Sequence, residues 1–421
     1  MNDTPRTKTY IQLSFWIAAT LVGVIAVLYA KLIALFQSKY FFYYNLHPYL
    51  VSICTPFLFM IATFWVIQIA PHAKGSGIPQ VLEAIELEGN KKFTSYASGL
   101  VSIKTAIVKV ISTLFGILGG ASIGREGPTV QLSASIFAMI SKITRRYTVH
   151  LDIRSYYIAG GAAGVAAAFN TPLAGITFAL EEMAGDFFSK FKRSVMFSII
   201  IAGVVAQFLV GDYLYFGHPD IPSLSFKIIP QAIFIGVFCG LLGGIFSRIL
   251  SQITFDILPE HWALKSFICG IVCAAITLMF HGKTAGSGYE VVREMMDKPN
   301  GQLPLLFGFG KFVTTVLSYL SGMAGGIFSP CLSIGAGLGY ILGKLSYFMN
   351  LKVCALIGMV AFFSGVVQAP LTAVMIVMEM TDEHSFILPF MLAAIIAQSV
   401  SKLLMPTPLY HYLAFKNKKI V

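Results

Sequence analysis

The chain has 421 residues, of which 56% are hydrophobic and 12% charged, and its mean hydropathy is +0.77. An average soluble domain carries charge on about a quarter of its residues, so this composition excludes an ordinary soluble protein and indicates an integral membrane protein. The net charge of +11 does not favour nucleic-acid binding, because the basic residues lie in short scattered runs, as do the loop charges that fix membrane topology.

Stretches without Asp, Glu, Lys or Arg mark the candidate membrane segments. They cover residues 12–30, 41–71, 194–211, 228–247, 312–343 and 353–378. About 20 apolar residues span the hydrocarbon core as a helix, whereas the alternating segments of a β-barrel are absent from the sequence. We therefore predict an all-α polytopic membrane protein.

Basic residues at the two ends indicate the orientation. Arg6 and Lys8 precede the first apolar segment, and Lys416 and Lys419 follow the last one. Both termini are expected on the cytoplasmic side, because positive charge is retained there. No small-x-small cleavage pattern follows near Ala30, so we expect no removed signal peptide.

The cysteines and histidines give no sign of a metal centre. All six cysteines lie in apolar stretches, which favours small buried thiols over disulfides or metal ligands. They are Cys54, Cys239, Cys269, Cys273, Cys331 and Cys354. The histidines form no HExxH motif or His/Cys cluster, so neither a metal site nor a cofactor is predicted.

Three motifs combine glycine with proline inside apolar sequence. In chain order they are GSGIPQV (75–81), GREGPTVQ (124–131) and GGIFSP (325–330). Proline is most at home in the first turn of a helix, so each motif predicts a helix that begins inside the membrane. The first N–H groups of a helix carry about half a positive charge, and several such ends that meet would bind an anion.

Glycine also lets helices pack closely, which is the simpler explanation for spaced pairs. We interpret Gly335 with Gly339, and Gly116 with Gly120, as packing pairs of this kind. Close packing alone does not explain the prolines and polar residues of the three motifs.

Polar side chains accompany the predicted helix starts. Ser76 would supply a hydroxyl donor at the first start, and Tyr410, in PTPLYHYL (406–413), would supply another. Helix capping and anchoring at the membrane interface are the structural alternatives for these two residues. Phe328 is a packing residue by default, but at a helix start its backbone N–H is an equally good candidate.

Glu126 lies in the second motif, inside apolar sequence. An ionisable residue is costly within a membrane, so it indicates a functional role by default. Its carboxylate would occupy the place of an anion when ionised and vacate it when protonated, which would couple protons to the anion. The alternative is an ion pair with Arg125 that only fixes the loop, although adjacent residues rarely face one another in a helix.

Glu181 and Glu182 end a long apolar run in ALEEM (179–183). One of them is a candidate proton relay, and both are otherwise ordinary charges at a helix end.

An internal repeat divides the chain. FNTPLAGITFALEEM (169–183) aligns without gaps with VQAPLTAVMIVMEMT (367–381), which superposes Glu181 on Glu379. GSGIP (75–79) is echoed by GSGYE (286–290). We predict a first transmembrane repeat at 1–211, a linker at 212–227 and a second repeat at 228–421, an organisation typical of transporters with inverted repeats.

The motifs together resemble the CLC chloride channel and transporter family in order and approximate spacing, from about residue 72 to residue 412. The resemblance rests on GSGIP, GREGPTVQ, FNTPLAGITFALEEM, GGIFSP, APLTAVMIVMEMTD and PLY. It implies inverted repeats of tilted and broken helices, and a homodimer in which each subunit has its own anion path.

The resemblance also implies roles for individual residues. Ser76 and Tyr410 would hold the central anion, with backbone N–H groups from Ile327 and Phe328. Glu126 resembles the external gating glutamate that exchanges with chloride and carries the proton. Two further assignments follow: Glu182 as the internal proton acceptor and Lys109 as a basic residue near the pathway.

Glu182 favours a chloride/proton antiporter over a passive chloride channel, because the family's channels lack this acceptor. An intramembrane enzyme is the third hypothesis, but HExxH, paired intramembrane aspartates and a P-loop are all absent from the sequence. Gln80 stands where many relatives have an acid, whereas Ser76 resembles the chloride-selective pattern. The chain ends soon after Tyr410, so we expect no nucleotide-binding regulatory pair and a prokaryotic cell membrane as its location.

Overall fold

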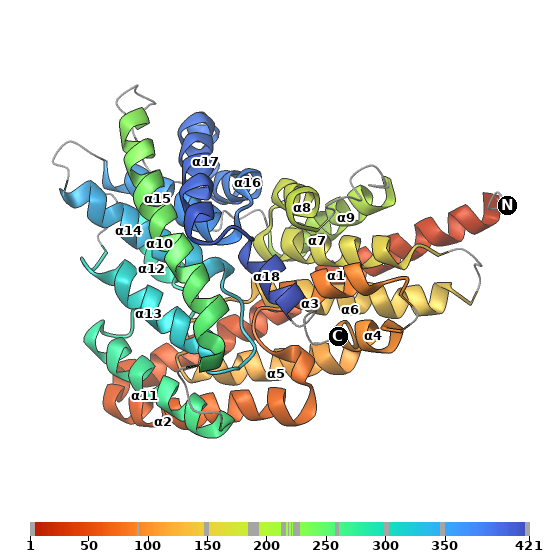
Figure 1. Cartoon of the computed structure of the whole chain (residues 1–421), viewed down its shortest axis with the longest axis horizontal. Helices are drawn as coiled ribbons and strands as arrows, with labels where there is room; N and C mark the ends of the chain where they lie inside the picture. The colour runs from red at the N-terminus through yellow and green to blue at the C-terminus, as the bar shows by residue number, and fades with distance from the viewer. Residues whose placement is uncertain are drawn as a thin grey trace.

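The chain folds into a bundle of tilted helices of unequal length, seen in a computed structural model (Figure 1). The structure describes residues 5–90, 92–146, 151–183, 193–211, 216–217, 219, 221, 228–256, 261–298, 303–345 and 350–416. Within these residues the regular structure is helical, with isolated backbone bridges between loops. Most of the predicted linker at 212–227 lies outside them.

The first half of the chain contains nine of the described α-helices. They are α1 (Pro5–Leu46), α2 (Pro48–Phe64), α3 (Ile78–Leu87), α4 (Thr94–Leu100), α5 (Ile103–Leu118), α6 (Glu126–Thr144), α7 (Ile153–Phe169), α8 (Pro172–Phe178) and α9 (Arg193–Val210). Two π-helical turns, Trp65–Ile69 and Ala179–Met183, extend α2 and α8, and a 3₁₀ turn covers Pro71–Ala73.

The second half supplies the remaining described α-helices. They are α10 (Ile228–Asp256), α11 (Trp262–Met279), α12 (Tyr289–Asp297), α13 (Phe307–Leu320), α14 (Phe328–Leu345), α15 (Leu351–Val367), α16 (Pro370–Thr381), α17 (Ile387–Leu404) and α18 (Leu409–Phe415). A 3₁₀ turn at His384–Phe386 precedes α17. Among the described residues, seven helical segments are long and apolar enough to cross a membrane.

Charge-free sequence does not always form one continuous helix. The stretch 312–343 is broken between α13 and α14, and the stretch 353–378 is broken between α15 and α16. At the second break, Gln368 adopts a left-handed φ of 63° and ends α15. Ala369 is then non-helical, with φ of −115° and ψ of 83°, because Pro370 disfavours a helical residue before it. Asn170, with φ of 60°, ends α7 before Pro172 in the same way.

Corresponding helices in the two halves make corresponding contacts. In the first half α6 packs on α7 and α1 packs on α9, and in the second half α14 packs on α15 and α10 packs on α17. Helices of one half also pack on helices of the other: α2 lies against α11, α8 against α16 and α3 against α18 (Figure 1). The middle of the molecule is therefore enclosed by elements of both halves.

The two glycine pairs behave differently. Gly335 and Gly339 lie where α14 meets α15, and a methyl group on either one would strike the backbone of Gly358 or Cys354, so this packing interpretation is confirmed. Gly120 does not form a helical pair with Gly116, because α5 ends at Leu118 and Gly120 turns the chain with φ of 73° against the Tyr40 ring. That part of the prediction was wrong.

The cysteines are free thiols, as predicted, and five of them are buried. Cys54 is the exception: it is exposed on α2, so the prediction of burial was wrong for this residue. An apolar helix face needs no protein cover in a membrane, because lipid is itself apolar.

Candidate functional site

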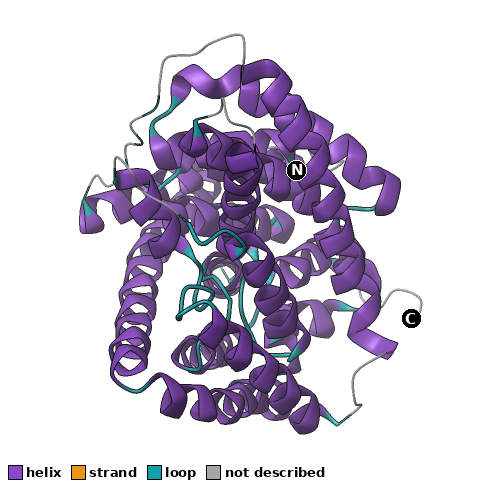
Figure 2. Ribbon diagram, turned by 90° about the vertical axis from the view of Figure 1, so that its left-hand side faces the viewer, coloured by secondary structure: helices purple, strands orange, loops and turns teal. Residues whose placement is uncertain are grey.

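Backbone hydrogen bonds tie the three glycine-rich motifs together. Gly75 donates to the Met323 carbonyl over 3.0 Å and accepts from Gly325 over 3.1 Å. Gly124 and Gly326 exchange two bonds of 2.7 and 2.9 Å. Figure 2 shows loop segments lying among the helices near the middle of the molecule. Motifs far apart in sequence thus meet at one buried junction.

Each motif ends in a helix start, as predicted. Helices α3, α6 and α14 begin at Ile78, Glu126 and Phe328. Gly77 precedes α3 with φ of 106°, a backbone conformation that favours glycine. The first N–H groups of a helix have no acceptor within it, so this junction gathers positive backbone ends from both halves of the chain.

The start of α6 packs closely on Ser76, which lies just before α3. A Cβ on Gly127 would collide with the Ser76 hydroxyl and lie 2.8 Å from the Ser76 carbonyl oxygen and 3.2 Å from Cα of Gly326. A glycine is therefore required at 127 for steric reasons, and it brings the amide side of α6 against Ser76.

The predicted anion ligands come together at this junction. Ser76 and Tyr410 are 1% and 0% exposed, and their hydroxyls face each other. Neither hydroxyl oxygen makes a well-formed hydrogen bond to another described residue. Buried hydroxyls normally have a partner, so this pair has donor capacity available to a ligand.

Phe328 closes the apolar side of the junction. Its ring stacks on the Tyr410 ring, with centroids 6.2 Å apart and planes 11° apart, and it also packs on Phe363 at 4.6 Å. Ile327 is buried directly before the start of α14. The side chains of Ile327 and Phe328 are packing groups. Because these residues lie at the start of α14, their backbone N–H groups are the candidate donors to an anion.

Lys109 is fully buried on α5 and lies behind the first motif. Its Nζ donates to the Gly75 carbonyl over 2.9 Å. Lys311, on α13 in the second half, similarly holds the Thr284 and Gly286 carbonyls at 2.8 and 2.6 Å. Both lysines therefore hold the backbone carbonyls of glycine-rich loops.

Glu126 is the first residue of α6 and is only 1% exposed. Its Oε1 accepts a hydrogen bond of 2.7 Å from Ser329 in the third motif. The neighbouring Arg125 guanidinium donates to the Ala168 carbonyl over 3.3 Å. The Glu126 carboxylate therefore lies between the starts of α6 and α14.

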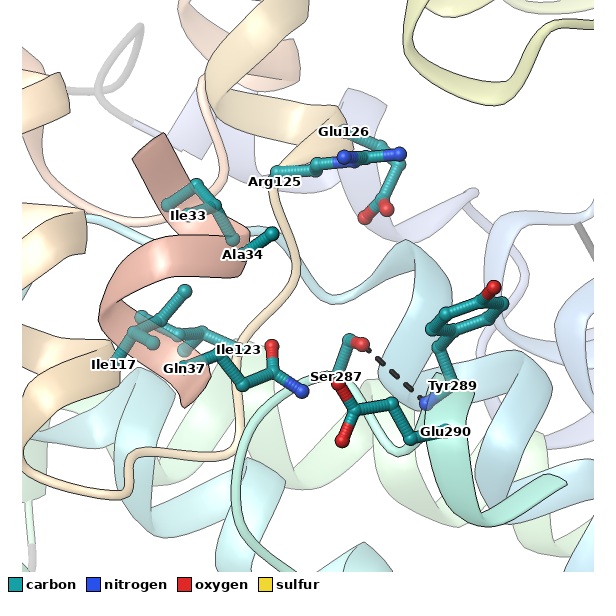
Figure 3. Close-up of a pocket in the computed structure, with 10 residues that line it drawn as sticks. All are labelled: Ile33, Ala34, Gln37, Ile117, Ile123, Arg125, Glu126, Ser287, Tyr289 and Glu290. Carbon is teal, nitrogen blue, oxygen red and sulfur yellow. Dashed lines mark hydrogen bonds between the residues drawn. The ribbon is translucent and has the colours of Figure 1, made fainter. Parts of the chain in front are cut away.

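A cavity of about 180 Å³ reaches this glutamate. Figure 3 shows Arg125 and Glu126 on one side of it, opposite Ser287, Tyr289 and Glu290, with Gln37 of α1 nearby. Glu290 is exposed whereas Glu126 is buried, so the cavity connects a polar outer rim with the carboxylate.

The two adjacent glutamates of ALEEM have different surroundings. Glu181 accepts hydrogen bonds from the N–H groups of Leu371 and Thr372 at the start of α16, over 3.0 and 2.7 Å. Glu182 is buried at 3% exposure, and its Oε1 makes no hydrogen bond to a described residue. The structure thus distinguishes a capping glutamate from a buried one, which the sequence left open.

Sequence reasoning missed several polar residues that shape the junction. Ser329 belongs to the GGIFSP motif, but its hydrogen bond to Glu126 joins residues of different halves. Such a contact has no signal in the local sequence. Ser112 bridges the Ala62 carbonyl and the Ala324 N–H over 2.8 and 3.0 Å. Gln80, noted only as a missing charge, donates to the Lys74 carbonyl over 2.7 Å and so fixes the loop before α3.

Broken helices that begin at a shared buried junction are the architecture of ion transporters and channels. The model of the voltage gated chloride channel family matches residues 57–402, and the chain therefore belongs to this family.

Two curated relatives are similar over most of their length. The H(+)/Cl(-) exchange transporter ClcA of Vibrio cholerae serotype O1 is 31% identical over 382 residues, 86% of this chain and 79% of the relative. ClcA of Vibrio parahaemolyticus is 31% identical over 378 residues, 86% of this chain and 78% of the relative.

Solved structures share the fold. A slow cyanobacterial Cl⁻/H⁺ antiporter superposes with a TM-score of 0.83 at 23% identity, covering 99% of both chains. A CLC-type fluoride/proton antiporter gives 0.81 at 21% identity, covering 98% of this chain and 99% of that chain. The predicted fold class and family are confirmed.

Proposed function

We propose that the protein is a secondary active antiporter that exchanges chloride for protons across a membrane. The names of its curated relatives support this substrate pair. The observation that carries the proposal is the position of the Glu126 carboxylate, buried at the start of α6 and bonded to Ser329 beside the start of α14. An anion and this carboxylate would compete for the same helix ends.

The proposed anion site lies between the hydroxyls of Ser76 and Tyr410 and the backbone N–H groups of Ile327 and Phe328. Neutral donors suit a transported ion, because binding must be weak enough for the ion to leave. Lys109 contributes a positive potential through the Gly75 loop that it holds. The resemblance of Ser76 to the chloride-selective pattern of the family supports chloride as the transported anion.

Glu126 is the proposed gate and proton carrier. Ionised, it occupies the anion's place near the helix starts; protonated, it withdraws into the cavity lined by Gln37 and Glu290 and exchanges its proton there. Glu182 is the proposed proton acceptor on the other side, because it is buried and its Oε1 is available.

Transport into liposomes tests the proposal directly. Purified protein is reconstituted with a chloride gradient and a pH indicator inside the vesicles. The wild type is expected to move protons against their gradient, and Glu182→Gln is expected to move chloride without protons. Chloride movement in both proteins with no pH change would make the protein a channel.

A passive chloride channel is the alternative within the same fold. In that case Glu126 would still gate, but proton movement would not be coupled in a fixed ratio. The reversal potential separates the two: a channel follows the chloride gradient alone, whereas an exchanger shifts when the pH gradient changes. We propose no enzymatic activity, in keeping with the transporter names of the relatives.

We further propose a cell membrane of prokaryotic type as the location, with both termini cytoplasmic and with repeats at 1–211 and 228–421 around a linker at 212–227. The matching packing of helices in the two halves supports the repeats. Labelling of single cysteines near Lys8 and Lys416 from either side of the membrane tests the orientation, since labelling from the outer side would contradict it.

We propose a homodimer with one pathway per subunit. Large apolar side chains are exposed beside the junction of α8 and α16, with Leu173 and Leu371 50% and 47% exposed and Phe208 of α9 87% exposed. A second copy of the chain would cover this face, and lipid would cover the other apolar faces. Cross-linking between introduced cysteines at Leu173 is expected to give dimers, and exclusively monomeric protein would contradict the proposal.

A further inference from the structure

His411 lies next to the proposed internal proton acceptor. It belongs to α18, which packs on α3 (Figure 1). Its Nε2 is 3.2 Å from the Glu182 backbone carbonyl oxygen and 3.8 Å from Oε1 of the same residue. A single ring nitrogen thus faces both the backbone and the carboxyl group of Glu182.

Exposure differs sharply between the two side chains. The His411 side chain is 33% exposed, whereas that of Glu182 is 3% exposed. The imidazole therefore lies between the surface of the protein and a carboxyl group that the surface does not reach. The hydrogen-bonding capacity of Glu182 Oε1 is not used by any described residue.

We propose that His411 is the residue through which protons pass between the internal solution and Glu182. This inference rests on the proposed antiport. Imidazole changes charge near neutral pH more readily than any other unperturbed side chain, so a partly exposed histidine can take up and release protons at a useful rate.

The proton transfer balances without a further reactant. The Glu182 carbonyl can only accept, so the neighbouring Nε2 carries a hydrogen and Nδ1 is the basic nitrogen. A proton from solution binds Nδ1 and gives the imidazolium. The Nε2 proton then passes to Glu182 Oε1 after a small rotation of that side chain closes the 3.8 Å separation, and neutral imidazole remains.

Other charged groups near the pair are few in the described part of the chain. Glu181 adjoins Glu182, Glu86 of α3 acts on His411, and Lys416 lies at the end of α18 with its Nζ on the Ser251 carbonyl of α10. Tyr410 of α18 adjoins Glu182 on the side of the anion site.

The test compares His411→Gln with the wild type in liposomes that carry a chloride gradient. Proton uptake driven by chloride is expected to fall at least about tenfold, while chloride flux changes less than about twofold. His384→Gln is the matched control, because His384 forms a histidine–carboxylate pair of 3.0 Å with Asp382 at an exposed site. That variant is expected to behave like the wild type.

A purely structural role would give a different result. If His411 only bonds the Glu182 carbonyl, its replacement lowers thermal stability but leaves the ratio of protons to chloride unchanged, and this outcome overturns the inference. Added imidazole provides a second measurement, since it is expected to restore proton uptake in His411→Ala and would not repair a structural loss.

The two proposals fail in distinguishable ways. If the wild type moves no protons, the antiport itself is wrong. If the wild type moves protons, Glu182→Gln does not, and His411→Gln transports protons at the wild-type rate, only the role of His411 is wrong. Size-exclusion profiles of the variants identify any that fail to fold. Imidazole rescue of His411→Ala then decides whether His411 transfers protons or has only a structural role.

Discussion

Glu181 and Glu379 cap each other's helices across the boundary between the two halves. Glu181 accepts from Leu371 and Thr372 at the start of α16, and Glu379 accepts from Leu173 and Ala174 at the start of α8 over 3.1 and 2.7 Å. Each carboxylate satisfies amides that a proline-led helix start leaves without acceptors. Glu181 and Glu379 occupy equivalent positions in the internal repeat, and in the structure they make equivalent, reciprocal contacts.

Loss of either cap is expected to weaken the junction between the halves. Glu181→Gln and Glu379→Gln should each lower the free energy of unfolding by about 1–2 kcal/mol, because a charge-assisted cap is replaced by a weaker neutral one. Thermal unfolding of the detergent-solubilised protein measures the effect. Glu294→Gln is the control, since Glu294 forms an exposed ion pair with Lys298 at the C-terminal end of α12, and such pairs contribute little.

The same variants separate capping from proton transfer. Glu181→Gln is expected to retain chloride-driven proton uptake, whereas Glu182→Gln is not. Loss of proton uptake in a folded Glu181→Gln protein would assign the internal acceptor to the wrong glutamate.

Neutralising Glu126 is expected to uncouple the transporter. In Glu126→Gln a neutral amide replaces the carboxylate bonded to Ser329, so no proton can be carried and the anion no longer competes with a charge. Chloride flux in liposomes should persist and lose its dependence on pH. Glu290→Gln is the matched control in the same cavity, and proton-coupled flux in Glu126→Gln would contradict the gating role.

Removing the Tyr410 hydroxyl is expected to weaken anion binding. Tyr410→Phe retains the ring that stacks on Phe328 but loses one donor, which is worth about 1.5 kcal/mol, or roughly tenfold in affinity. Isothermal titration with chloride measures this. Tyr340→Phe is the control, because Tyr340 is another buried tyrosine whose hydroxyl has no described partner. An equal loss in both variants would refute a specific role for Tyr410.

A methyl group at Gly127 is expected to disturb the proposed anion site. Gly127→Ala would place a carbon 2.8 Å from the Ser76 carbonyl oxygen, so α3 and α6 must move apart. Both chloride affinity and thermal stability should fall. Gly99→Ala should be tolerated, because its nearest neighbours are His72 side-chain atoms at 3.5 Å, an ordinary contact. Unchanged chloride binding in Gly127→Ala would show that the close approach is not required.

The helix starts could be predicted because their signals are local. Glycine followed by proline restricts the backbone within a few residues, and α3, α6 and α14 begin where GSGIP, GREGP and GGIFSP indicate. Buried polar contacts could not be predicted in this way. The bond between Ser329 and Glu126 joins residues of different halves, and its existence depends on how those halves pack.

Glycine spacing alone was an unreliable guide. The same spacing describes Gly335 with Gly339 and Gly116 with Gly120, but only the first pair lies within one helix. The difference arises from the end of α5 at Leu118, beyond which Gly120 adopts a positive φ. Exposure of Cys54 has a similar cause, since a lipid-facing helix surface is as apolar in sequence as a buried one.

The backbone bonds of Gly75 and Gly124 with the segment 323–326 have a consequence for biosynthesis. The first half of the chain emerges from the ribosome with two of the three helix starts, but their partners are translated much later. Until the third motif has been inserted, these backbone bonds lack their partners, and the junction that gathers the three helix starts is incomplete. Separately expressed halves would have to associate within the membrane before any transport began.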